Sequence, residues 1–133
     1  MYDFFKNIAD TNSWGFNYSP DDYRNLFQDC EAGKIYLFVD PITTDTIFSD
    51  VGNETITYSG KFFLVLSSDV DEEYLDKYND YIKPLISGAG GILKTELACT
   101  NYQINQWKQL EVINILDENM DGLMITYNIT LID

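Results

Sequence analysis

Residues 123–131, near the end of the chain, form a predicted strand that alternates strictly between apolar and polar side chains from Ile125 onwards. Ile125, Tyr127 and Ile129 point to one side of an extended strand, and the threonine and asparagine side chains between them point to the other. A strand with one buried face and one polar face is typical of an antiparallel sheet. This pattern therefore places a half-buried sheet at the centre of any fold the chain adopts.

Several other segments have the β-branched and aromatic composition of strands. They are residues 34–39, 55–58, 61–67, 93–100 and 109–116. Asp40 and Pro41 should end the first of these, because proline cannot donate a hydrogen bond to a strand ladder. Ser59 and Gly60 predict a tight hairpin between the second and the third. Residues 42–53 are predicted as a long loop, a feature that is usually functional or mobile.

Two segments have helical signals. Ser19 as N-cap, Pro20 at the first helical position and apolar residues at helical spacing predict a helix over residues 22–30 that ends at Gly33. A second helix is predicted over residues 69–86, with carboxylates at its N-terminus. The apolar residues expected on its inner side are Tyr74, Leu75, Tyr78, Tyr81, Ile82, Leu85 and Ile86. The glycines at 88–91 are expected to end this helix.

These elements predict an α+β fold with the order α-β-β-β-α-β-β-β. We expect a single domain over residues 19–133, in which a mainly antiparallel sheet of about five or six strands packs with two helices. An aromatic N-terminal arm, residues 1–18, precedes it. Trp14, Phe16 and Tyr18 alternate around Gly15 in this arm. They could dock onto a partner or fold back onto the core, and the sequence does not separate these two possibilities.

The charge excludes whole classes of partner. The chain carries 22 acidic against 8 basic residues, a net charge of −14. Such a surface repels nucleic acid and anionic lipid, so we expect no direct nucleic-acid or membrane binding. The acidity either keeps the protein soluble or lets it face a polyanion without adhering to it. No signal peptide or membrane span is expected. The two cysteines, Cys30 and Cys99, are far apart and match no metal-binding or CxxC spacing, so we expect a reducing compartment, the cytosol.

Catalytic chemistry is not expected. Histidine is absent, which removes the commonest general base and metal ligand. The glycine cluster at 88–91 follows a predicted helix, whereas a phosphate-binding loop precedes one. Pairs of carboxylates lie at predicted turns and helix starts, where they are interpreted as solvated surface. We therefore expect no enzyme activity and no cofactor.

One segment partly matches a calcium loop. Asp117, Asn119 and Asp121, followed by Gly122, fit the first half of an EF-hand. Position 12 of that loop is Asn128 instead of glutamate, and the flanking segments are predicted strands. We therefore predict an acidic hairpin loop, with these three residues only a weak calcium candidate.

The layout resembles the tail terminator and tail completion proteins of tailed bacteriophages, which act at the head–tail joint. The resemblance rests on the helix at 22–30, KIYLFVDP at 34–41, KFFLVL at 61–66, the helix at 71–86 and the closing hairpin at 112–132. It implies a ring-forming virion protein, commonly a hexamer, that is assembled in the host bacterial cytoplasm. Its partners would be copies of itself, the tail tube and the head connector.

Such a ring caps the tail tube at the phage neck, and a lumen lined by carboxylates would let DNA pass without adhering. Within it, subunit contacts are expected at the aromatic arm and the long loop. The candidate interface residues are Trp14, Phe16, Tyr18, Ile47, Phe48 and Val51.

Two other classes remain open. An acidic DNA mimic would inhibit a nuclease or another DNA-binding protein by imitating phosphates, and it would be a monomer or dimer. A small enzyme that uses carboxylates alone would need a deep pocket with a buried Asp or Glu.

Overall fold

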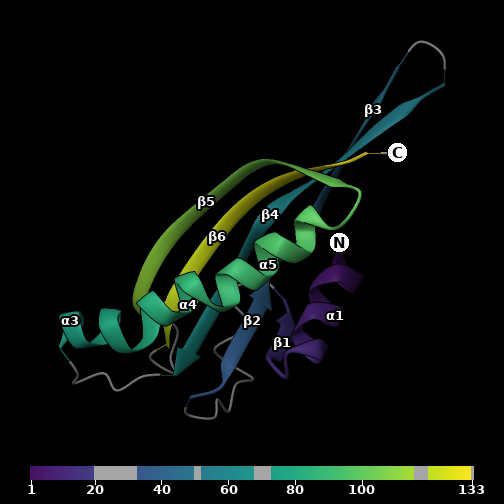
Figure 1. Ribbon diagram of the computed structural model, residues 1–133. Coiled ribbons are helices and arrows are strands. Elements are labelled where there is room, and N and C mark those ends of the chain that lie inside the picture. The colour runs from purple at the N-terminus through teal and green to yellow at the C-terminus, as the bar shows by residue number, and fades with distance from the viewer. Residues whose placement is uncertain (20–32, 50–51, 68–72, 116–119, 133) are drawn as a thin grey trace.

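Six strands form one mainly antiparallel sheet, and the helices cover one of its faces (Figure 1). The computed structural model describes residues 1–19, 33–49, 52–67, 73–115 and 120–132. The predicted α+β class is confirmed, and the order of elements matches roughly. The predicted helix at 22–30 lies outside the described residues.

The strand order in the sheet is β1-β2-β4-β6-β5, and β3 pairs with β4 off this path. The strands are β1 (Gly15–Tyr18), β2 (Ile35–Val39), β3 (Thr43–Phe48), β4 (Glu54–Ser67), β5 (Tyr102–Ile115) and β6 (Met120–Leu131). Only β1 and β2 run parallel to each other among the described pairs. The predicted strand at 123–131 forms most of β6, which pairs with a long neighbour on each side.

The predicted hairpin at Ser59 and Gly60 is wrong. These residues lie inside β4, a continuous strand of 14 residues, and Gly60 pairs with Tyr127 of β6. A Cβ atom added at Gly60 would lie 3.2 Å from the hydroxyl of Tyr127. Glycine is therefore present to make room for the tyrosine ring, and the chain does not turn here.

The predicted loop at 42–53 is also wrong for its larger part. Residues 43–48 form β3, which pairs in antiparallel register with the first half of β4, from Thr43 opposite Ser59 to Phe48 opposite Glu54. The true hairpin of this region thus turns between Ser49 and Asn53. Threonine-rich strands carry little apolar signal, which explains why the sequence pattern indicated a loop.

The helices are α1 (Tyr2–Thr11), α3 (Tyr74–Lys77), a π-helical segment (Tyr78–Ile82), α4 (Lys83–Ser87) and α5 (Ala89–Ala98). The π-helical segment ends two residues before Pro84, which has no N–H to donate to the carbonyl of the turn before it. The predicted helix thus continues to Ser87 and breaks at Gly88.

The predicted strand at 93–100 is wrong, because residues 93–98 belong to α5 and the last two form a turn. Ala89, Leu93 and Leu97 are spaced four apart and are all buried against the sheet. The glycines Gly90 and Gly91 therefore lie inside a helix instead of ending one.

Replacing Gly91 with alanine should raise the free energy of unfolding by about 0.5–1 kcal/mol, because alanine loses less backbone entropy in a helix. A Cβ atom at Gly91 meets nothing within 4 Å, whereas one at Gly90 would lie 3.2 Å from the Leu85 carbonyl. Gly90→Ala is thus the matched control, with a smaller gain. Urea unfolding measures the free energy of unfolding of both variants. A lower value for Gly91→Ala than for the unmodified chain would contradict the placement of Gly91 inside a helix.

The core lies between the helices and the sheet. All of the strands except β3 contribute apolar side chains to it. The helices α1, α4 and α5 close it on the other side. Figure 1 shows these helices lying over the sheet. A second, smaller cluster of buried residues lies on the other face of the sheet. Its members are Tyr36, Phe38, Phe63, Val65, Val112 and Met120.

The N-terminal segment is part of this domain. Its first part is α1, which places Phe5, Ile8 and Ala9 in the core between helices and sheet. Its last part is β1, which extends the sheet beyond β2. Residues 1–18 therefore fold onto the domain and do not form a separate arm.

Candidate protein-protein interface

The hairpin of β3 and β4 extends past the rest of the sheet. On one side, β4 pairs with β6 only from Thr57 onwards, so residues 54–56 pair with β3 alone. Figure 1 shows this two-stranded ribbon reaching away from the helices. A two-stranded ribbon buries few apolar side chains of its own. It is therefore stabilised mainly by hydrogen bonds within the hairpin or by contacts with a partner.

Local hydrogen bonds close the end of the ribbon. The Ser49 N–H and the Ser49 hydroxyl both donate to the Asn53 carbonyl, at 2.8 and 3.0 Å. Next to this turn, the side chains of Ile47 and Phe48 are 62% and 72% exposed. Two large apolar side chains on a projecting ribbon are suited to contact another protein. Val51, the third candidate of this region, lies outside the described residues.

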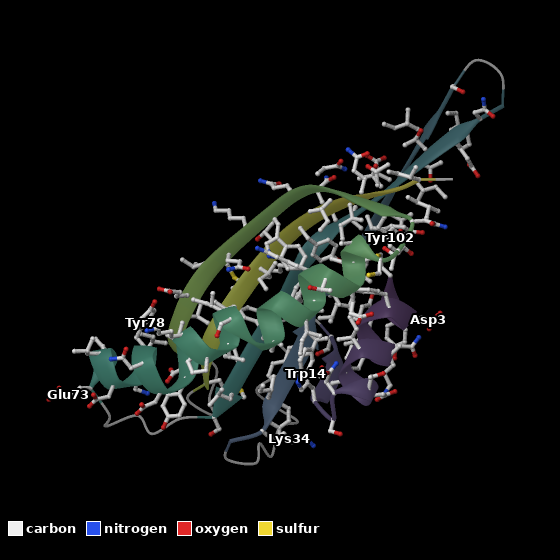
Figure 2. All side chains as sticks on the ribbon, viewed as in Figure 1. Asp3, Trp14, Lys34, Glu73, Tyr78 and Tyr102 are labelled. Atoms are coloured by element: carbon white, nitrogen blue, oxygen red, sulfur yellow. The ribbon has the colours of Figure 1, made fainter. Side chains whose placement is uncertain are left out.

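The aromatic candidates of the N-terminal segment lie elsewhere. Trp14 and Phe16 are partly buried against the core, and Trp14 lies near α1, away from the hairpin (Figure 2). Tyr18 is more exposed, and its hydroxyl accepts a 3.1 Å hydrogen bond from the Ile42 N–H at the base of β3. The ring of Tyr2 stacks edge-on against Phe16 and Tyr18. The structure therefore brings Tyr18 to the base of the hairpin and leaves Trp14 apart from it.

A second exposed apolar group lies on α3, at the opposite end of the molecule from the hairpin (Figure 1). Tyr74 and Leu75 are 69% and 70% exposed, although the sequence pattern placed them on the inner side of the helix. Tyr78, labelled in Figure 2, is also exposed. The helix is rotated from the expected orientation, because Lys77 is the residue that points inward.

Lys77 forms a buried ion pair that the sequence pattern did not indicate. Its Nζ atom lies 3.1 Å from Oδ2 of Asp121 on β6, and both side chains are fully buried. Two predictions therefore need correction. Asp121 is not part of a solvated acidic surface, and a carboxylate paired with a buried ammonium is unsuited to bind calcium. Asp117 and Asn119, the other calcium candidates, lie outside the described residues.

Another buried polar group is the hydroxyl of Tyr127, which has no hydrogen-bond partner among the described residues. Burial raises the pKa of this phenol, and Tyr18 and Asp40 add to the effect. Tyr127 is also one of the residues that line an open depression, together with Lys61, Gln106 and Thr126. Lys61 pairs with Asp40 at 3.6 Å near this depression. Asp40 also lines this open depression, and its side chain is only 14% exposed.

Other kinds of site find no support in the described part of the chain. It contains no group of three or more His, Cys, Asp or Glu side chains that could hold a metal ion. None of its helices is long and apolar enough to cross a membrane. The hairpin end, with its two exposed large apolar side chains, is a candidate functional surface. A comparison with protein-family models and with curated proteins finds no match for this chain.

Proposed function

We propose that this protein is a structural subunit of a bacteriophage virion. In this proposal, copies of the chain assemble in the host cytoplasm into a ring at the neck, where the ring joins the tail tube to the head connector and DNA passes through its lumen. It acts through contacts with other proteins and carries out no catalysis. The observation that carries the proposal is the projecting hairpin with exposed Ile47 and Phe48.

A second observation supports a subunit that touches partners at two ends. The hairpin lies at one end of the molecule, and the exposed Tyr74 and Leu75 of α3 lie at the other (Figure 1). A neck protein must contact components above and below it as well as its own copies. Apolar side chains at both ends are suited to that arrangement.

The distribution of exposed carboxylates supports a ring whose lumen does not bind DNA. The helices carry many of the exposed carboxylates, namely Asp3, Asp10, Asp76, Asp80 and Glu96. The polar face of the sheet near the hairpin is instead rich in uncharged Thr, Asn and Gln side chains. A ring with its helices facing the lumen would repel the phosphates of DNA, which would then slide through.

The proposal predicts that a hairpin variant assembles less well without losing its fold. Replacing both Ile47 and Phe48 with serine should weaken assembly about 1,000-fold, since each of the two apolar anchors contributes about 2 kcal/mol at an interface. Circular dichroism should stay unchanged, because both side chains are exposed. Native mass spectrometry and negative-stain microscopy, in moderate salt to screen repulsion between acidic subunits, measure the assembly.

Ile92→Ser is the control, because Ile92 is an exposed aliphatic residue on α5, away from the hairpin. It should assemble as the unmodified chain does. If the unmodified chain stays monomeric at high concentration, both alone and with tail-tube and connector proteins, the proposal is wrong. A monomer that instead binds a nuclease or another DNA-binding protein would support the DNA-mimic alternative.

A further inference from the structure

The sheet has an open edge on each of two opposite sides. Within the described residues, β5 pairs only with β6, and β3 pairs only with β4. Because β4 pairs with β6 along 57–67, its pairing with β3 must use its other side. Each open edge presents unpaired N–H and C=O groups, and β5 offers them along a strand of 14 residues. A long open edge of this kind accepts a further strand.

The directions of the two edge strands are complementary. Each step from β3 through β4 and β6 to β5 is antiparallel, so β3 and β5 run in opposite directions within one molecule. When two copies stand side by side in the same orientation, β3 of one therefore meets β5 of the next as an antiparallel pair. Such a contact joins two different surfaces, and its repetition closes into a ring when the rotation allows.

The charges on the two edges are also complementary. Asp45 is the only charged residue of β3, and Lys108 is the only basic residue of β5. Both side chains are exposed. Asp45 lies opposite Thr57 and Lys108 lies opposite Thr126, so the strand register places them on the same face of the sheet. Two β5 edges that met at Lys108 would instead bring like charges together.

We propose that β3 of one copy adds to the open edge of β5 in the next copy as an antiparallel strand, with Asp45 opposite Lys108. This register places Thr43 opposite Leu110 and Ile47 opposite Gln106. Phe48, the last residue of β3, then lies opposite Asn105, at the irregularity in β5 between Ile104 and Gln106. The inference rests on the proposed self-assembly and adds to it the pair of strands that makes the contact.

Cysteine cross-linking tests the register. In a background in which Cys30 and Cys99 are replaced with serine, the variant that carries both Asp45→Cys and Lys108→Cys should form covalent multimers under mild oxidation. Each single variant should not. A matched control combines Asp45→Cys with Glu111→Cys, because Glu111 lies on the opposite face of the sheet, as its pairing with Leu123 shows. That pair should stay uncross-linked.

Charge exchange gives a second readout in the native background. Asp45→Lys and Lys108→Asp should each weaken assembly about tenfold, because each creates a like-charge pair across the strands. The double variant should restore it. If rings form but cross-linking and charge exchange have no effect, this inference is wrong while the proposed function stands. If the unmodified chain never assembles, the proposed function is wrong and this inference with it.

Discussion

Replacing Lys77 with methionine should lower the free energy of unfolding by about 3–5 kcal/mol, since it leaves a buried carboxylate without its cation. Lys77 and Asp121 are fully buried and lie 3.1 Å apart. The pair joins the first helical turn after residue 73 to the start of β6, two elements that are distant in the sequence. Urea unfolding followed by circular dichroism measures the change as a lower midpoint at constant slope.

A double variant separates the ion pair from packing. Lys77→Met combined with Asp121→Leu should recover much of the lost stability, because buried pairs replaced on both sides by apolar groups are often tolerated. The control is Lys6→Met, which breaks the 2.8 Å pair with Asp10 on the exposed surface of α1. It should leave the unfolding midpoint unchanged. If Lys77→Met behaves like this control, the buried pair does not hold α3 against the sheet.

The parts of the fold that the sequence predicts well are those with a long and regular pattern. Residues 123–131 lie within β6 as expected, because the strict alternation from Ile125 to Leu131 is typical of a strand with one buried face. The apolar run at 34–39 is likewise a buried strand that ends before Asp40 and Pro41. Each of these patterns lies within a single segment, so it predicts the strand without knowledge of the neighbouring elements.

The errors share a different cause, which is contact between distant residues. Gly60 has the local features of a turn, but its small size is needed by Tyr127 on another strand. Asp121 follows an acidic segment and looks like part of a solvated loop, but its partner is Lys77. Leu93 and Leu97 fit a strand and a helix equally well, and only burial against the sheet decides for the helix.

The candidate interface was predictable in part. Ile47 and Phe48 were identified because they are the large apolar residues in a polar segment, and they are exposed on the hairpin. The hairpin itself, the open edge of β5 and the exposed face of α3 were not predicted. Strand partners and helix rotation depend on the whole sheet, so a local pattern does not determine them.

Replacing Phe5 with alanine should lower the free energy of unfolding by about 3–5 kcal/mol, because it opens a cavity in the main core. Phe5 is fully buried on α1, and its ring centre lies 5.1 Å from that of Phe62 and 5.7 Å from that of Tyr127. Asn7→Ala, at an exposed position of the same helix, is the matched control and should change stability little. Urea unfolding compares the two variants.

The same packing predicts what happens when residues 1–18 are removed. The deletion takes Phe5, Ile8 and Ala9 out of the core and strips β1 from the edge of β2, so the remaining chain should lose its cooperative unfolding transition. Assembly would then fail as a consequence of unfolding. Circular dichroism and a thermal melt of the truncated protein test this directly. A truncated protein that still melts cooperatively would show that α1 and β1 are dispensable for the core, and Trp14, Phe16 and Tyr18 would again be free to serve as an interface.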